Sequence, residues 1–500
     1  MSTQDDTAEP EALSLKSAQG RWVLAVTVIG SGIAGLDATV VNIALPSIGR
    51  SFHSGEGTLQ WVVSGYALTL AAFLLLGGSL GDRLGRKRIF TVGVAWFAVA
   101  SALCGLAPDA GVLIAARLLQ GVGGALLAPA SLAILQASFR ESDRGRAIGA
   151  WSGLGGVATA AGPLIGGYLI AAGSWRFVFY INLPFAVMVM VMATRHVPET
   201  RDDTANGKVD AGGAVLAVLF LAGLTYGLIE GPAHGWTDPL VLGGLIMAGL
   251  TAPAFLLYEH SRKAPMLPLE FFRSRQFSGT NAVTFLVYAA LSGAIFLLPT
   301  ELQLVEHDNP LESGLALLPV TALMLVLSAQ SGQLAARIGP RLQMSVGPLV
   351  IGGGLCLLAR ATDGSNYFVY VLPAVLIFAV GLTITVAPLT ATAMASVPAT
   401  HAGVASAINN VVARAGGLIA VAVLPLVGGI AFSSAHFASG FRVALVVAGV
   451  TCAAGGVLAA LTIRNPNQVQ RHSVLRRSRP YYCAVDGAPL QPDVTVGSGD

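Results

Sequence analysis

One carboxylate and one guanidinium lie inside otherwise apolar stretches of this sequence, where they could carry proton chemistry. Asp37 is the only ionisable residue between Trp22 and Pro46, and Arg117 lies in an apolar run that begins near residue 111. A bare carboxylate in hydrocarbon is costly, so Asp37 must be buried in protein, paired, or protonated for part of the time. We therefore interpret Asp37 as a proton-switchable group.

The depths of these two side chains allow them to meet. At about 1.5 Å per residue, Asp37 lies roughly 12 Å below the far end of its span, and Arg117 lies roughly 9 Å below the start of its own. An arginine stays protonated, so Arg117 would favour the ionised form of Asp37 and make its protonation sensitive to water and to substrate charge. The alternative is a static ion pair that only locks two helices together.

Membrane-spanning elements must hold these residues, and the composition predicts such elements. The 500 residues are 54% hydrophobic and 11% charged, whereas soluble domains carry about 25% charged residues. The 60 glycines would let many helices pack closely. We expect an all-α polytopic membrane protein with fourteen transmembrane helices, near 22–44, 58–80, 89–107, 111–136, 145–171, 176–194, 210–230, 237–258, 279–302, 312–336, 342–359, 368–394, 402–430 and 441–463.

The basic residues predict the orientation of these helices. If both termini are cytosolic, most of the 29 Lys and Arg residues fall in cytosolic segments, as the positive-inside rule requires. We expect a multi-pass protein of the plasma membrane with cytosolic N and C termini, and the lack of a eukaryotic targeting signal favours a bacterial inner membrane. The basic residues on the outer side would be Arg50, Arg176, Arg360 and Arg442.

A repeated motif predicts an internal duplication. GGSLGDRLGRKR at 77–88 and SGQLAARIGPR at 331–341 each close an apolar run and share Gly, Leu, Arg and Gly at equal spacing. Two related halves around a midplane site are typical of alternating-access transporters, although chance similarity between glycine-rich helix ends would look the same. The expected parts are a cytosolic tail (1–20), an N-terminal six-helix half (21–195), a linker with two extra transmembrane helices (196–278), a C-terminal six-helix half (279–463) and a disordered cytosolic tail (464–500).

Several stretches resemble the signature motifs of the major facilitator superfamily, in particular its fourteen-span drug:proton antiporter branch. The resemblance implies the major facilitator fold, with two six-helix halves plus two inserted helices, and a proton-coupling role for Asp37 and Arg117. The motifs of the superfamily are LDATVVNIALP (36–46), GGSLGDRLGRKRIF (77–90), LIAARLLQGVGGA (113–125) and GPLIGG (162–167). Further matches to the branch are WVVSGYAL (61–68), SWRFVFYINLP (174–184) and PMLPLEFFRSRQF (265–277).

The loop between the second and third spans is too short and too charged for a binding pocket. In the family it resembles a conformational latch, in which Asp82 would sit near Gly403 at the positive N-terminus of the thirteenth span. Arg83 or Arg86 would pair with Glu141 or Asp143. The alternative is that the basic residues only anchor the loop in the cytosol. The latch residues would be Gly78, Asp82, Arg83, Gly85 and Arg86.

The fifth span contains the antiporter-type motif of the resemblance. The longer pattern would have glycine at position 158, where this chain has Ala158, and this departure weakens the inference of export direction. Proline removes a helical hydrogen bond and glycine removes bulk, so the span would serve as a hinge or seal, with ordinary small-residue packing as the alternative. The motif residues are Gly149, Gly162, Pro163, Gly166 and Gly167.

Polar and aromatic residues within the spans are candidates for the wall of a substrate cavity, because such a wall suits amphipathic substrates. Helix packing or an interfacial belt is the alternative for most of them. Arg414 is the exception, since it lies midway along its span without an evident acidic partner. The candidates are Asn42, Trp61, Tyr66, Gln120, Tyr288 and Arg414.

The sequence contains no Walker motif, no clustered His/Cys spacing and no mid-span histidine, so we expect no enzyme, cofactor, metal site or nucleic-acid partner. The resemblance implies a proton-coupled antiporter that exports small amphipathic drugs or antibiotics and confers resistance. Its partners would be a small-molecule substrate, protons and the lipid bilayer, and it would work as a monomer. The alternatives are an exporter or importer of a specific metabolite, such as an amino acid or siderophore, and a non-transporting membrane sensor.

Overall fold

A computed structural model describes residues 13–201, 210–262, 265–361, 366–398, 402–430 and 434–465. The described residues from 13 to 463 belong to one compact unit. Nearly all of the expected C-terminal tail, and the expected N-terminal tail up to residue 12, lie outside the described residues.

The described chain is built from helices, fourteen of which are long and apolar enough to cross a membrane. This confirms the predicted number of spans. In chain order the helices are α1 (Ala18–Phe52), α2 (Glu56–Leu84), α3 (Arg86–Leu106), α4 (Ala110–Ser138), α5 (Glu141–Ala171), α6 (Phe177–Tyr180), α7 (Asn182–His196), α8 (Ala211–His234), α9 (Pro239–Ser261), η1 (Leu269–Arg273), α10 (Arg275–Leu304), α11 (Pro310–Ala316), α12 (Leu318–Ile338), α13 (Pro340–Leu358), η2 (Tyr367–Val371), α14 (Leu372–Ala395), α15 (Ala402–Gly428) and α16 (Ser434–Thr462).

Two predicted spans differ from continuous helices because proline interrupts them. The sixth span is divided at Ile181 into α6 and α7, and the tenth is divided at Leu317 into α11 and α12. Pro184 and Pro319 follow these breaks and have no N–H to donate to the carbonyl four residues earlier. Pro319 also has the fixed φ that suits the first turn of a helix.

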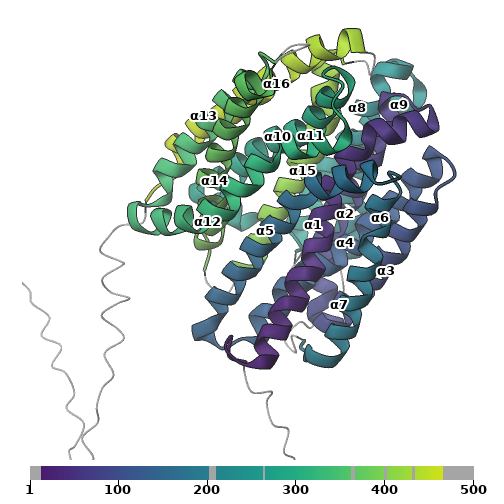
Figure 1. Cartoon of the computed structure of the whole chain (residues 1–500). Coiled ribbons are helices and arrows are strands. Elements are labelled where there is room, and N and C mark those ends of the chain that lie inside the picture. Colours follow the sequence, from purple (N-terminus) through teal and green to yellow (C-terminus); the bar gives the residue numbers. More distant parts are fainter. Residues whose placement is uncertain are drawn as a thin grey trace, which may run out of the picture. The chain divides into compact units, whose positions relative to one another are not determined.

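Helices α1–α7, here the N-terminal helix group, lie beside helices α10–α16, the C-terminal helix group (Figure 1). Helices α8 and α9 pack on each other, and α8 also packs against α2 and α15, one helix from each group. The exact domain limits at 21–195, 196–278 and 279–463 stay a prediction.

The two repeated loops have the same backbone conformation. Gly85 joins α2 to α3 with a φ of 107°, and Gly339 joins α12 to α13 with a φ of 88°. Each glycine N–H donates to the carbonyl four residues earlier, on Gly81 and on Ala335. Only glycine adopts such φ values readily, so the shared glycine of the two sequence motifs has a shared structural cause.

The two helix groups share a core at one end of the bundle. We call the end where α1 and α10 begin the terminal end, and the other the distal end. The largest buried apolar cluster contains distal residues of both groups, such as Ile43 and Leu297. At the terminal end the cores are separate: Phe90 and Phe139 belong to a cluster based on the N-terminal helix group, and Phe277 to one in the C-terminal helix group.

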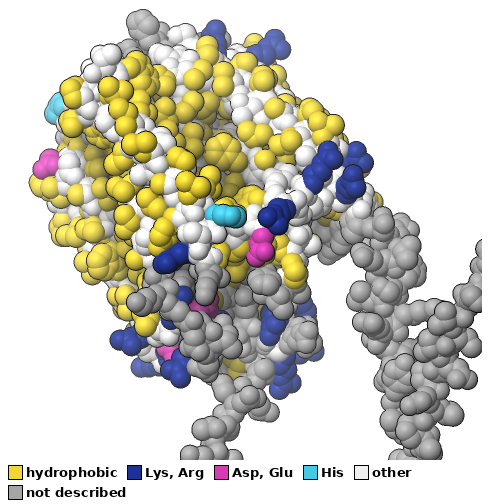
Figure 2. Space-filling model, turned by 180° about the vertical axis from the view of Figure 1, so that it is seen from behind, with side chains coloured by type: hydrophobic (Ala, Val, Ile, Leu, Met, Phe, Trp, Pro, Cys, Tyr) yellow, Lys and Arg dark blue, Asp and Glu magenta, His cyan; other side chains and the backbone are white. Residues whose placement is uncertain are grey.

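Apolar side chains cover most of the outer surface. Figure 2 shows one face, on which hydrophobic side chains predominate and many Lys and Arg side chains gather toward the lower part. Exposed residues such as Val99, Leu240 and Leu257 lie on membrane-length helices. Such a surface suits contact with lipid chains.

Candidate functional site

The structure brings Asp37 and Arg117 together inside the N-terminal helix group. Arg117 Nη1 on α4 donates to Asp37 Oδ2 on α1, and the two side chains are 1% and 0% exposed. Arg117 Nε also donates to the Val62 carbonyl on α2, at 3.0 Å, and the guanidinium lies 4.4 Å from the centre of the Tyr66 ring. Each charge of the pair is therefore balanced within the protein.

Amide side chains satisfy the other carboxylate oxygen. Gln120 Nε2 and Asn182 Nδ2 donate to Asp37 Oδ1 at 2.9 and 3.0 Å. Both amides also donate to Ser101 Oγ, at 3.2 and 2.9 Å, and Ser101 donates to the Phe179 carbonyl at 2.9 Å. We call Asp37, Ser101, Arg117, Gln120 and Asn182 the buried polar network. Because all three partners of Asp37 are N–H donors, the geometry suits an ionised carboxylate.

Close helix packing positions this network. A Cβ on Gly93 of α3, or on Gly123 of α4, would lie less than 3.0 Å from backbone atoms of the other helix. Glycine at these positions lets α3 and α4 approach, which brings Ser101 within reach of Gln120. The polar network therefore depends on small residues elsewhere on the same helices.

Sequence reasoning identified three members of the network and did not select the other two. Asn182 stands in the stretch 174–184 that matches the antiporter branch, and an asparagine within a membrane span is a usable signal. Ser101 gives no such signal, because serine is common at helix contacts in membranes.

Four of the six cavity candidates make hydrogen bonds within the protein. Trp61 Nε1 donates to Glu230 Oε1 on α8 at 2.6 Å, so this indole packs against the inserted helices. Tyr66 is buried and donates to the Ala34 carbonyl at 3.1 Å, and Gln120 belongs to the buried polar network. Asn42 Nδ2 donates to the Ala38 carbonyl on its own helix. Glu230 also contacts His234 on its own helix, at 3.2 Å.

The other two cavity candidates lie between the helix groups. Arg414 on α15 and Tyr288 on α10 are both partly exposed, and they are near enough to interact electrostatically. Tyr66 on α2 is also within electrostatic range of Arg414. These two residues therefore remain candidates for contact with a substrate.

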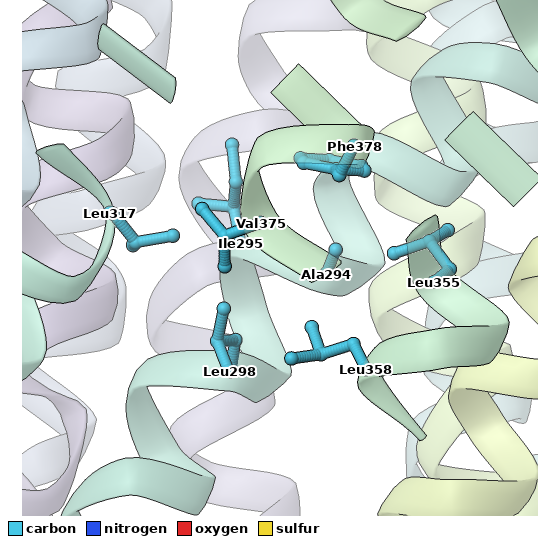
Figure 3. A pocket seen from close by; sticks show the side chains of 8 residues that line it. All are labelled: Ala294, Ile295, Leu298, Leu317, Leu355, Leu358, Val375 and Phe378. Atoms are coloured by element: carbon cyan, nitrogen blue, oxygen red, sulfur yellow. The ribbon is translucent and has the colours of Figure 1, made fainter. Parts of the chain in front are cut away.

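A small pocket lies elsewhere, within the distal part of the C-terminal helix group. Figure 3 shows eight side chains around it, all of them apolar and none of them predicted as a site residue. No side chain among them could orient a polar ligand. The lining residues are Ala294, Ile295, Leu298, Leu317, Leu355, Leu358, Val375 and Phe378.

The antiporter motif on α5 contacts α1 on one side and α11 on the other. A Cβ on Gly162 would collide with Thr39, and one on Gly166 with Val40. A Cβ on Gly167 would collide with the Pro310 backbone, and a Cβ on Gly314 of α11 would collide with the Pro163 carbonyl. This part of the motif therefore helps to join the two helix groups at the distal end.

The terminal half of α5 is less closely packed than its distal half. A Cβ added to any of five glycines there would have no atom of the described residues within 4 Å. Together with the separate terminal cores, this indicates that the helix groups stand apart at the terminal end. The glycines are Gly145, Gly149, Gly153, Gly155 and Gly156.

The latch residues make local contacts in this conformation. Arg86 pairs with Asp82 at 2.8 Å rather than with Asp143, which accepts instead from the Leu15 N–H at 3.0 Å. Glu199 accepts from the backbone N–H groups of Lys87 and Arg88, at 3.0 and 3.1 Å. The side chain of Glu141 and the surroundings of Gly403 lie outside the described parts of the chain. Gly78, Arg83 and Gly85 lie on the same helix end.

Fourteen candidate membrane spans and a shared distal core define a multi-pass membrane protein with the architecture of a transporter. The profile of the Major Facilitator Superfamily matches residues 27–421. The chain belongs to the major facilitator superfamily, and it is a transporter rather than an enzyme.

Named relatives and a solved structure agree with this family. The chain is 36% identical over 402 residues to the Multidrug resistance protein Stp of Mycobacterium tuberculosis, covering 80% of this chain and 74% of the relative. It is 36% identical over 417 residues to the Tetracenomycin C resistance and export protein of Streptomyces glaucescens, covering 83% and 77%. The crystal structure of the peptide transporter POT in complex with sulfate has a TM-score of 0.67 at 14% identity, covering 90% and 96%, which shows the shared fold.

Proposed function

We propose that the protein is a proton-coupled antiporter that exports small amphipathic organic compounds, such as drugs or antibiotics. The single observation that carries this proposal is the buried pair of Asp37 and Arg117. The relatives support the direction and the substrate class, because one is named for multidrug resistance and the other for resistance and export. The proposal includes a plasma-membrane location, cytosolic termini and function as a monomer.

Proton binding at Asp37 has a physical route to helix movement. Protonation removes the negative charge and leaves Arg117 buried without a counter-charge, which is strongly unfavourable. About two turns further along α1, the Ile43 carbonyl accepts a hydrogen bond from Gln303 of α10 at 3.0 Å. A shift of α1 that accommodates the new charge state would therefore disturb the contact between the helix groups at the distal end.

The transport cycle follows from this coupling. Protonation of Asp37 from outside would accompany outward release of the substrate, and loss of the proton to the cytosol would reset the cytosol-facing state. Each positive elementary charge that moves inward across the membrane releases about 2.3 kcal/mol of free energy per 100 mV of membrane potential. The proton gradient would then supply the free energy for export.

Growth inhibition in a pump-deficient bacterial host tests the proposal. Cells with the wild-type protein should tolerate higher concentrations of some compounds in a drug panel than cells with Asp37→Asn. Because Asp37→Asn leaves Arg117 uncompensated, the double variant Asp37→Asn/Arg117→Gln serves as a second variant without either charge. Asp238→Asn, which changes an N-terminal cap of α9, is the control and should retain tolerance. Equal sensitivity of all strains at equal protein levels would overturn the proposal.

A further inference from the structure

Arg414 places a positive charge near the middle of a membrane-length helix. It lies roughly 18 Å along α15 from Ala402 at about 1.5 Å per residue, within a hydrocarbon core of about 30 Å. Among the described residues, no hydrogen bond or ion pair involves its guanidinium. An arginine keeps its charge under these conditions, so the position is energetically costly unless something else meets it.

The side chain points from α15 toward the N-terminal helix group. Val411 and Leu418 are one helical turn to either side of Arg414, and therefore share its face. Val411 packs against the apolar cluster of the N-terminal helix group, and Leu418 packs with Leu68 and Ala71 of α2. Arg414 therefore lies on the face of α15 that meets the other helix group.

Two tyrosines interact electrostatically with Arg414, and one of them also contacts the buried polar network. Tyr66 of α2 and Tyr288 of α10 are both within electrostatic range of Arg414. The Arg117 guanidinium also lies over the ring of Tyr66, 4.4 Å from its centre. Tyr66 therefore interacts electrostatically with Arg414 and with both members of the proton-binding pair.

The charges in the middle of the membrane do not cancel. Asp37 and Arg117 neutralise each other, and Arg414 adds one positive charge. Every other Asp or Glu of the described membrane-length helices lies within two turns of a helix end. The space between the helix groups is therefore electropositive at its centre, and a guanidinium there favours a carboxylate or another oxyanion.

We propose that Arg414, beside Tyr288 and Tyr66, binds the anionic group of an amphipathic organic anion and repels organic cations. This inference rests on the proposed function and specifies its substrate class as carboxylates or phenolates with an apolar body. This substrate class has an energetic consequence. One proton entering and one monoanion leaving each move one positive elementary charge inward, so each exchange moves two in total. Transport should therefore depend on the membrane potential as well as on pH.

Three probes with one apolar body separate the charge effect from general hydrophobicity: pyrenebutyrate, pyrenebutanol and pyrenebutylammonium. Binding to the purified protein is measured by the change in pyrene fluorescence. Wild type should bind pyrenebutyrate about ten to one hundred times more tightly than the ammonium probe, the range expected for a charge-assisted hydrogen bond. Arg414→Gln should lose this preference, and Arg414→Lys should keep most of it.

The binding results decide the inference even if no transport is found. Equal binding of the anion and the cation by wild type would overturn the inference. It would also be overturned if Arg414→Gln melts at the wild-type temperature and binds pyrenebutyrate as tightly as wild type does. Transport in everted vesicles then separates the two proposals. Export of all three probes without charge preference would support antiport and contradict the role of Arg414. Binding of the anion with no proton-driven movement of any probe would support the role of Arg414 and contradict antiport.

Discussion

Asp37 is tolerable in the bundle because its hydrogen-bonding capacity is filled from three side chains on two neighbouring helices. The ion pair with Arg117 supplies charge, and the amides of Gln120 and Asn182 supply neutral donors. Removing one donor from a buried charged group usually costs more than the hydrogen bond itself contributes. Substitution of a single amide donor of the buried polar network should therefore lower the stability of the protein measurably.

We expect Asn182→Ala to lower the free energy of unfolding by about 1–3 kcal/mol, because it removes donors to both Asp37 and Ser101. Thermal unfolding in detergent measures the effect. Asn42→Ala is the matched control: Asn42 is also buried, and the Oδ1 of each asparagine has no hydrogen-bond partner among the described residues, but Asn42 Nδ2 donates only within its own helix. Equal losses for the two variants would contradict a special role for Asn182 in holding the carboxylate.

At the scale of elements, α5 has two different halves. Its distal half is packed tightly against α1 and α11 through the GPLIGG motif, whereas its terminal half is open. The motif thus acts as a distal seal in this conformation. Gly149 belongs to the same sequence pattern but lies on the open part.

This contrast predicts that Gly167→Ala weakens the distal seal, because its Cβ collides with the Pro310 backbone. Overpacking of this kind costs about 1–3 kcal/mol, which is roughly a tenfold or greater shift toward a distal opening. The rate of maleimide labelling at Ser313→Cys, a buried position on α11, measures the opening in a protein without other cysteines. Gly149→Ala should leave the rate unchanged. Similar rates in both variants would show that the motif glycines do not seal the bundle.

The turn at Gly85, which joins the end of α2 to the start of α3, allows a test of the proposed latch. Asp82 and Arg86 are partly exposed, and exposed ion pairs contribute at most about 1 kcal/mol to stability. We expect Asp82→Asn to change stability by less than about 1 kcal/mol and yet to reduce substrate export severely. Comparison of melting temperature with export in everted vesicles separates these effects. Wild-type export would mean that the loop only fixes orientation.

At the scale of the whole molecule, the sequence predicts what depends on pattern and misses what depends on packing. Apolar length predicts the fourteen spans, and the repeat predicts two loops built around Gly85 and Gly339. The contact of Asp37 with Arg117 could be anticipated from their similar depths, because depth depends only on position along a helix. The hydrogen bond of Trp61 could not be predicted, because its partner Glu230 is on the inserted helix α8. The sequence does not indicate which helices α8 packs against. Ser101 was missed because serine is common at helix contacts in membranes and gives no signal of its own.

The central claim is that Asp37 binds and releases the proton that drives export. Its most direct test is proton movement in proteoliposomes with a pH-sensitive dye inside, using the compound whose growth inhibition the wild-type protein relieves most. Addition of this compound should produce a proton flux with wild type, and no flux with Asp37→Asn or with Asp37→Asn/Arg117→Gln. A wild-type flux in both variants, with folded protein present in each, would contradict the account.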